Sequence, residues 1–482
     1  MTRKFALIAS IWLFSGCAAA AGEETAVLEE AASGEGGTTA WSYRIAGALD
    51  QRVWAVAPDP ENGAYIAGDT THDLWYRSEE VGLSDHGDPA PFLARIDPFG
   101  RLLWVKTDPE HDHAVAFAVG SNRSGDVVVA GRSDGAIVDL GCGSDLDPAG
   151  QTALWITSFD ANGNCRLART FVVEEGPFVI FGVPGATVLP DGGVVVAGHF
   201  SGRMDLDGVV IQGAQSSVQA PTPFVIALDA DGGVRWAKAF RPVDDPATVS
   251  TGGLALDVDN DAEGNLVIVG DARGDLEVDD HRIEPEGPGQ AAFVVRIAAD
   301  GTVVGAEAFG ERARATSVDV RDDATAVVGG TFLGNLQWRG GALLSTPGQT
   351  PDGFVIKLDG AGAASWSRRA WGSTLELEID VSVDSNGFVG VAGAWSRGSL
   401  NLAPHAFYGD GSRSRYSFVA RLGAVSGDTM WARMFEGIYV ADVAATGNRR
   451  LVLGGPFAEP ADFGDRVLTP NAVDGFVVRV YP

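Results

Sequence analysis

A short pair of residues ending in glycine recurs along the chain, each time at the end of an apolar segment. The pairs are Ala67-Gly68, Ala130-Gly131, Ala197-Gly198, Val269-Gly270, Gly329-Gly330, Ala392-Gly393 and Gly454-Gly455. Successive glycines of these pairs are 63, 67, 72, 60, 63 and 62 residues apart. A repeat of this length built from short strands is typical of a β-propeller, in which every repeat forms one blade.

Each repeat predicts a blade of four antiparallel strands. The second strand ends in the glycine pair and is expected to be buried on both faces. The third strand alternates, with Lys or Arg on its outward face in several copies, and begins with an aromatic residue: Phe92, Trp155, Phe224, Phe293, Phe354, Phe418 and Phe476. An Asp-x-x-Gly turn follows in most copies. The fourth strand carries a tryptophan in four repeats, which we expect to pack between blades: Trp104, Trp236, Trp366 and Trp431.

The two ends of the repeat region complement each other. Residues 476–482 form a third strand with no fourth strand after it, and residues 41–47 form a fourth strand with no first three before it. We therefore expect residues 41–47 to complete the C-terminal blade, which would leave no open blade edge. The predicted fold is an all-β, seven-bladed β-propeller over residues 41–482.

The first residues predict export. Arg3 and Lys4 precede a ten-residue apolar run, which is too short to span a bilayer stably. The following Phe14-Ser-Gly-Cys17 resembles the bacterial lipobox, which implies a lipoprotein signal peptide over residues 1–16 and lipid attachment at Cys17. The alternative is an ordinary secretory signal cleaved a few residues later. Residues 17–40 are small and acidic, as expected of a flexible tether. The expected location is the bacterial cell envelope, anchored by lipid to the outer membrane.

Charge and cysteine content narrow the classes of partner. The net charge is −29 at pH 7, and removal of Arg3 and Lys4 with the signal would make it two units more negative. Such a surface repels nucleic acid and anionic headgroups, so we expect membrane contact only through the lipid anchor. Cys142 and Cys165 remain as a candidate disulfide, since paired cysteines in exported proteins often bridge. Two unpaired thiols are the alternative.

Several motifs of the repeats resemble a known family. Val381–Gly393 (VSVDSNGFVGVAG), Asp352–Asp359 (DGFVIKLD) and the Gly-x-x-x-Trp ending are similar to the repeats of bacterial seven-bladed β-propeller repeat (SBBP) lipoproteins. The resemblance covers about residues 41–482. It implies the propeller architecture but no particular activity.

The segment between the second and third strands is a long insert in each repeat, and equivalent inserts are expected on one side of the ring. Aromatic residues there are candidates for a binding face that anchors an envelope protein or a glycan: Trp75, Tyr76, Trp338, Phe407 and Tyr408. The alternative is that these aromatics pack the inserts onto their own blades.

Neither a metal site nor a cofactor is predicted. His111-Asp112-His113 lacks further ligands at a fixed spacing, so a metal there is not expected. Asp257–Gly264 (DVDNDAEG) resembles an oxygen-rich calcium loop but lacks the closing glutamate. Calcium is therefore a minor alternative to an ordinary hairpin turn.

Two classes of function fit these features. The first is a non-enzymatic binding or scaffolding module of the envelope. The second is an extracellular hydrolase or lyase acting on polysaccharide or peptide through carboxylates at the central channel. The element Asp229–Trp236 (DADGGVRW) also resembles the tryptophan-docking repeat of quinoprotein dehydrogenases and of BamB-like assembly lipoproteins. A BamB-like scaffold is thus an alternative, whereas no Ser/His/Asp set, P-loop or paired-His motif is present to predict catalysis.

The lipobox generates the first testable prediction. Cys17→Ser removes the sulfur that would carry the lipid, so the protein should leave the membrane fraction while keeping its fold. Fractionation of cells with circular dichroism of the released protein measures both properties. A Cys17→Ser variant that still sediments with membranes would contradict lipid anchoring.

Overall fold

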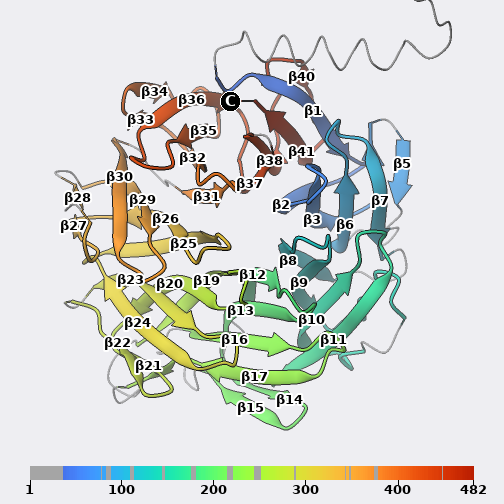
Figure 1. Ribbon diagram of the computed structural model, residues 1–482. Helices are drawn as coiled ribbons and strands as arrows, with labels where there is room; N and C mark the ends of the chain where they lie inside the picture. The colour runs from blue at the N-terminus through green and yellow to red at the C-terminus, as the bar shows by residue number, and fades with distance from the viewer. Residues whose placement is uncertain are drawn as a thin grey trace, which may run out of the picture.

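The computed structural model describes residues 36–77, 79–82, 88–108, 113–143, 147–174, 181–213, 221–243, 251–286, 289–341, 344–346, 349–373, 378–447 and 449–481. Within these ranges the chain is all-β. Its strands form four-stranded antiparallel sheets arranged as the blades of a β-propeller around a central axis (Figure 1). In the same ranges no helix is long and apolar enough to cross a bilayer.

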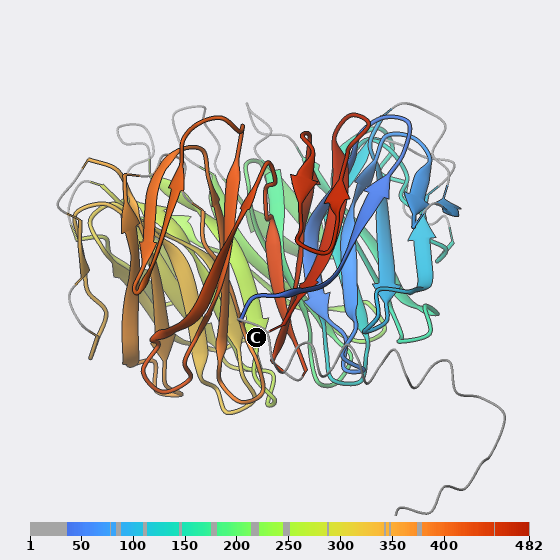
Figure 2. The same cartoon turned by 90° about the horizontal axis from the view of Figure 1, so that it is seen from above.

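The strands of each blade follow chain order from the axis to the rim, and the blades stand side by side (Figure 2). Three blades come from the first half of the chain. The first contains β2 (Gln51–Pro58), β3 (Ala64–Thr70), β6 (Ala90–Ile96) and β7 (Leu102–Thr107), and the second contains β8 (Ala114–Ser121), β9 (Val127–Asp134), β10 (Thr152–Phe159) and β11 (Cys165–Glu174). The third contains β12 (Phe181–Val188), β13 (Val194–Phe200), β16 (Thr222–Leu228) and β17 (Val234–Ala239). Three more follow: β19 (Gly252–Asn260), β20 (Leu266–Arg273), β23 (Gln290–Ile297) and β24 (Val303–Phe309); β25 (Ala313–Val320), β26 (Ala326–Phe332), β29 (Asp352–Leu358) and β30 (Ala364–Gly372); β31 (Asp380–Val383), β32 (Val389–Trp395), β35 (Tyr416–Leu422) and β36 (Thr429–Glu436).

The last sheet joins the two ends of the described chain. It contains β37 (Asp442–Thr446), β38 (Arg450–Phe457), β41 (Asp474–Val480) and β1 (Thr39–Ala46) in that order. β1 runs antiparallel to β41, with Tyr43 opposite Val477. The first strands of the blades contact one another in chain order around the axis, and β37 contacts β2.

The recurring glycine has a steric cause that is the same in every blade. The glycine that ends each pair lies directly opposite the third-strand aromatic residue, as Gly330 lies opposite Phe354. A Cβ atom on Gly330 would be 2.1 Å from the carbonyl oxygen of Arg314 and 2.7 Å from the Phe354 ring. The other six pairs show the same arrangement: Gly68/Phe92, Gly131/Trp155, Gly198/Phe224, Gly270/Phe293, Gly393/Phe418 and Gly455/Phe476. The aromatic ring therefore fills the space that is left because glycine has no side chain.

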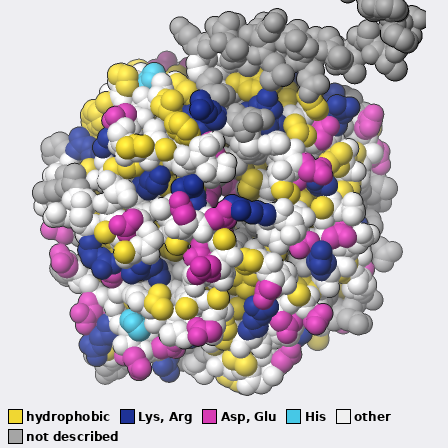
Figure 3. Space-filling model, viewed as in Figure 1, with side chains coloured by type: hydrophobic (Ala, Val, Ile, Leu, Met, Phe, Trp, Pro, Cys, Tyr) yellow, Lys and Arg dark blue, Asp and Glu magenta, His cyan; other side chains and the backbone are white. Residues whose placement is uncertain are grey.

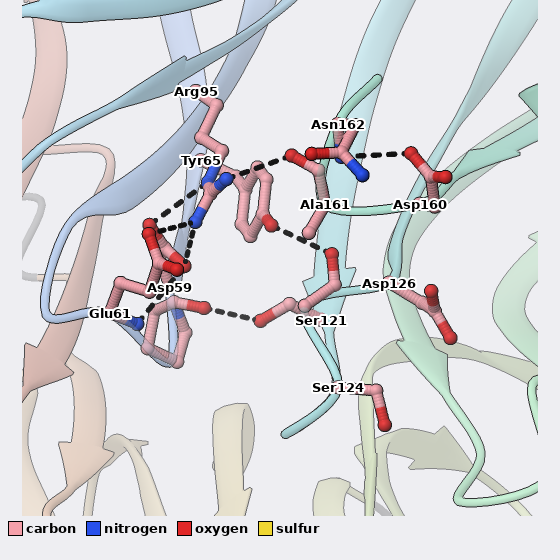
Figure 4. Close-up of polar contacts among 12 residues, drawn as sticks. Asp59, Glu61, Tyr65, Arg95, Ser121, Ser124, Asp126, Asp160, Ala161 and Asn162 are labelled. Carbon is pink, nitrogen blue, oxygen red and sulfur yellow. Dashed lines mark hydrogen bonds and ion pairs between the residues drawn. The ribbon is translucent and has the colours of Figure 1, made fainter. Parts of the chain in front are cut away.

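Four of the five basic residues of the third strands are buried and Arg296 is half-buried, so the prediction that they face outward is wrong for those four. Arg95 on β6 donates to both carboxylate oxygens of Asp59, at 3.0 and 2.9 Å, and to Glu61 at 2.9 Å (Figure 4). Its remaining Nη1 donates to the carbonyl of Ala161, in a turn of the next blade, at 2.8 Å. Tyr65 makes a parallel contact, because its hydroxyl donates to Gly125 of that same blade at 2.7 Å. Arg95 thus fastens one blade to the next and leaves none of its polar groups unsatisfied in the interior.

The same position makes the same kind of contact elsewhere. Lys357 donates to Ala424 of the next blade at 3.0 Å, and Arg421 donates to Arg449 of the next blade at 2.5 Å. Arg479 on β41 donates to the carbonyl of Pro98, which lies in the blade that begins the chain, at 2.5 Å. These contacts explain why sequence alternation misplaces the residues: a long cation reaches across the blade interface to carbonyl oxygens.

The fourth-strand tryptophans lie at the blade interfaces, as predicted. Trp104 donates to Ala161 at 3.0 Å, and Trp366 donates to Ala424 at 3.3 Å. Trp41 occupies this position on β1 and donates to Pro98 at 3.0 Å. Each of these three indoles therefore caps a turn of the next blade, whereas the buried Nε1 atoms of Trp236 and Trp431 have no hydrogen-bond partner among the described residues.

The inserts cover the outer strands of neighbouring blades. The hairpin β4 (Leu74–Tyr76) and β5 (Glu79–Gly82) pairs with β1, and β14 (Arg203–Leu206) with β15 (Val209–Gln212) pairs with β11. Likewise β21 (Leu276–Val278) with β22 (His281–Ile283) pairs with β18 (Arg241–Pro242), and β33 (Gly398–Leu402) with β34 (His405–Gly409) pairs with β30. The hairpins β27 (Asn335–Leu336) with β28 (Leu344–Ser345) and β39 (Ala461–Asp462) with β40 (Val467–Leu468) form separate two-stranded sheets. Three inserts thus extend the sheet of the preceding blade, because its outermost strand otherwise has unpaired backbone groups at its end, and β18, β21 and β22 form a separate three-stranded sheet.

The steric role of the glycine pair can be tested in one blade. Gly330→Ala forces a methyl group against the Arg314 carbonyl, so we expect the free energy of unfolding to fall by about 2 kcal/mol. Gly360→Ala is the matched control, because the nearest atom to its Cβ would lie at an ordinary 3.5 Å. Denaturant unfolding of both variants measures the difference. Equal stability of the two would contradict the packing constraint.

Candidate functional site

A groove of about 650 Å³ lies on the rim of the propeller, over the outermost strand β1. We call it the β1 groove. Its lining comes from three segments: Ser42–Arg44 with Ala46–Ala48 on and after β1, Asp73, Trp75 and Arg77 on the β4 side, and Arg466–Thr469 with Asn471 on the β40 side. Volumes of this size are typical of sites that hold small ligands.

Hydrogen bonds hold the two walls of the β1 groove against β1. On one side Ala46 of β1 lies opposite Trp75 of β4. On the other side Asp465, beside β40, accepts hydrogen bonds from the Ser42 N–H at 3.0 Å and the Ser42 hydroxyl at 2.6 Å. The stretch of β1 between these two contacts forms the floor of the groove.

Three arginines line the β1 groove of a chain whose net charge is −29. Arg77 places its guanidinium 4.5 Å from the centroid of the Tyr43 ring, and Arg466 places its guanidinium 5.4 Å from the same centroid. Arg466 is fixed there by an Nε–Asp465 hydrogen bond of 3.0 Å. Arg44 is 3.5 Å from the buried carboxylate of Asp474 and also donates to the Thr469 carbonyl. Arg77 and Arg466 thus converge on one aromatic ring.

The indole of Trp75 lies half-buried in the β1 groove, and Asp73 positions it. The Trp75 Nε1 donates to one oxygen of Asp73, while the other oxygen accepts the Ala48 N–H at 2.8 Å. Although partial burial opposes ionisation, these hydrogen bonds hold the pKa of Asp73 below its usual value. Asp73 is therefore a carboxylate that orients Trp75 with its N–H already satisfied.

The five aromatics predicted for a binding face lie in different environments. Tyr76 is buried and donates to Gly100 at 2.8 Å, and Trp338 is buried and donates to Gly362 at 2.7 Å. Phe407 packs partly buried against the core of its neighbouring blade. Trp75 lines the β1 groove, and Tyr408 is 68% exposed on β34. Of these five, Tyr408 is exposed, Trp75 and Phe407 are half-buried, and Tyr76 and Trp338 are buried.

The central channel is lined by carboxylates that link neighbouring blades. Five half-buried aspartates on first strands each accept a backbone N–H from the first strand of the next blade. The pairs are Asp257–Val318 (2.8 Å), Asp259–Val320 (2.7 Å), Asp319–Val383 (2.9 Å), Asp380–Val443 (2.7 Å) and Asp442–Val56 (2.6 Å). The Asp442–Val56 bond joins the last blade to the first. These carboxylates thus have a structural role at the blade interfaces.

Burial dominates the electrostatics of the channel carboxylates. It raises the pKa of Asp259 to about 6, and burial together with the Asp259 charge raises the pKa of Asp319 to about 8. Burial also raises the pKa of Asp380, and burial together with the Asp380 charge raises the pKa of Asp442 well above its usual value. The Asp380 charge acts on Asp442, so the two carboxyl groups titrate as a coupled pair.

The remaining predicted residues have plain placements. Cys142 and Cys165 form a disulfide with a Cα–Cα distance of 5.5 Å. Cys17, His111 and Asp112 lie outside the described residues, and no group of three His, Cys, Asp or Glu among the described ones is arranged to hold a metal ion. In the Asp257–Gly264 segment, Asp261 accepts the backbone N–H groups of its own turn.

Sequence analysis missed most of the β1 groove. Its two converging arginines come from positions 77 and 466, and only the pairing of β1 beside β41 and β4 brings them together. The sequence offers one signal for this groove. In a strongly acidic chain, Arg77 directly follows the aromatic pair of one insert, and Arg466 lies in another insert. The channel carboxylates carried a clearer signal, since Asp257 and Asp259 alternate along an otherwise apolar first strand.

Comparisons with known proteins find only distant similarities to solved structures. No family model matches the chain, and no curated protein matches it. A quinohemoprotein alcohol dehydrogenase from Pseudomonas putida is 11% identical, with 92% of this chain and 75% of that chain covered and a TM-score of 0.41. Sqt1 from Chaetomium thermophilum is 12% identical, with 91% and 98% covered and a TM-score of 0.42. The Pan2 WD40 domain of Neurospora crassa is 10% identical, with 76% and 89% covered and a TM-score of 0.33. These values carry no inference about function.

The channel carboxylates predict a dependence of stability on pH. Folding raises their pKa values, so the folded state binds more protons than the unfolded state between the ordinary aspartate range and about 8. Their contribution is complete below the ordinary range and is lost as the pH rises through the raised values. We expect the melting temperature to fall between about pH 5 and about pH 9.

Asp319→Asn should flatten this fall, because an amide stays neutral across the range and still accepts the Val383 N–H. Asp231→Asn, at an exposed turn position, is the control that removes an equal charge outside the channel. Calorimetric melting across the pH range compares the three proteins. An unchanged pH profile in Asp319→Asn would show that this carboxyl does not titrate as its surroundings imply.

Proposed function

We propose that this chain is a closed, seven-bladed propeller, anchored by lipid at Cys17 to the bacterial outer membrane, that works as a non-enzymatic binding module. Ring closure is supported by the pairing of β1 with β41 and by three contacts that cross the same blade junction. These are Asp442 to Val56, Arg479 to Pro98 and Trp41 to Pro98. The anchor is supported by the lipobox-like Phe14-Ser-Gly-Cys17, and the SBBP-like repeats agree with a lipoprotein.

The observation that carries a binding role is the β1 groove. Arg77 and Arg466 both approach the Tyr43 ring, Arg466 with its Nε bonded to Asp465, and the indole of Trp75 is oriented in the same groove by Asp73. Guanidinium N–H groups beside aromatic faces suit a ligand that carries an anionic group. The face seen in Figure 3 shows acidic and basic side chains interspersed.

The hydrolase or lyase alternative has one observation in its favour. Burial raises the pKa of Asp380 and, together with the Asp380 charge, that of Asp442, and paired carboxylates with raised pKa values are the usual groups of acid–base catalysis. Against it, each carboxylate already accepts a backbone N–H of the next blade, at 2.7 and 2.6 Å. Those bonds occupy oxygens that a substrate would need. A BamB-like scaffold differs from our proposal only in its partner, which would be an assembly protein.

The binding role can be tested in intact cells with the full-length protein. Trp75→Ala combined with Arg77→Ala removes the aromatic and the free cation, so chemical cross-linking followed by mass spectrometry should recover less of the envelope partner. Arg339→Ala is the matched control. Arg339 also follows a buried aromatic, Trp338, which donates to a turn glycine as Tyr76 does, but it lies far from the β1 groove. Equal recovery by all three proteins would contradict a role for the groove in binding.

A further inference from the structure

We propose that the β1 groove binds a carboxylated sugar, that is, a short oligosaccharide containing a uronic acid. This inference rests on the proposed binding function and specifies its ligand. Arg77 and Arg466 would hold the carboxylate, Trp75 would stack on the sugar ring, and Asp73 would position Trp75. The argument rests on the geometry of these four side chains.

The two arginines are prepared for an anion. Their guanidinium groups lie 4.5 and 5.4 Å from the centroid of Tyr43, and both arginines line the same groove. Asp465 holds only the Nε of Arg466, and no carboxylate in the described part of the chain forms an ion pair with Arg77. The terminal nitrogens of two guanidiniums are therefore available, and paired N–H groups bind a carboxylate with high specificity.

The rest of the lining suits a sugar. Trp75 offers the face of an indole whose N–H is already bonded to Asp73, and aromatic faces pack against the C–H groups of a pyranose. Asp73, Thr469 and Asn471 add acceptors and donors for hydroxyl groups along the same groove. The volume of about 650 Å³ fits a short oligosaccharide.

Charge selects a sparsely charged ligand over a polyanion. Asp73 stays ionised inside the groove, and the protein as a whole carries a net charge of −29. A dense polyanion would extend beyond the arginines and meet that acidic surface, whereas one carboxylate within the groove is attracted locally. The same argument disfavours an anionic lipid surface, which would present many charges at once.

Calorimetric titration of the purified full-length protein in detergent tests the ligand class. The probes are di- to tetrasaccharides of galacturonate, of alginate and of hyaluronan, with galactobiose as the uncharged counterpart of digalacturonate. We expect at least one uronate probe to bind at millimolar concentration or below, and galactobiose to bind roughly tenfold more weakly or not at all. No binding by any uronate probe, or equal binding of digalacturonate and galactobiose, would overturn the proposal.

Variants assign the binding to the groove. Arg77→Ala should weaken the uronate affinity roughly tenfold, and Arg339→Ala should leave it unchanged. Trp75→Ala should weaken it to a similar extent, while Trp75→Phe should restore most of the affinity because it keeps a stacking face. Uronate binding that survives both alanine substitutions would overturn the assignment.

Two further outcomes separate this inference from the proposed function. If phosphatidylglycerol vesicles bind in an Arg77-dependent manner and the uronates do not, the ligand is a lipid headgroup and the sugar assignment is wrong. If no uronate binds but the groove variant still loses its cross-linked partner in cells, the binding function stands and only the ligand class fails.

Discussion

The contact between a second-strand glycine and a third-strand aromatic ring sets the shape of every blade. The aromatic lies directly over the glycine, and the first-strand carbonyl approaches so closely that a methyl group would not fit. This arrangement lets three inner strands crowd together near the axis, where the blades are narrowest. Because the contact needs a particular residue at two fixed positions, it imprints the repeat on the sequence, and it explains why that repeat is visible without any alignment.

The sequence therefore predicts the strands of each blade well, but it predicts the contacts between neighbouring blades less well. Glycine pairs, aromatic starts and Asp-x-x-Gly turns depend on contacts within a blade, where partners are close along the chain. Arg95, Lys357, Arg421 and Arg479 depend on carbonyls of the next blade, and alternation alone places them wrongly on the surface. The inserts follow the same rule, since three of them join the sheet of the preceding blade rather than their own.

The candidate site was the hardest feature to predict, because it exists only after the chain ends meet. Trp75 was among the aromatics that the sequence singled out, yet nothing local distinguishes it from Tyr76, which is buried beside it. What separates them is strand parity: successive residues of β4 face opposite sides, so Tyr76 is buried against Tyr43 and Gly100, whereas Trp75 lines the β1 groove. Arg466 is 423 residues from Tyr43, and their proximity follows from the register of β1 against β41.

The docking of inserts onto the preceding blade changes what counts as a modular unit. A blade exchanged for a homologous copy would arrive with an insert shaped for the wrong neighbour, and its own rim would meet the following blade's insert without matching it. The segment that can be duplicated or replaced without such a mismatch runs from one insert to the next. It therefore joins the outer two strands of one blade to the inner two strands of the following blade. In a lineage that grows or shortens its ring, breakpoints should therefore fall within the middle of blades rather than between them.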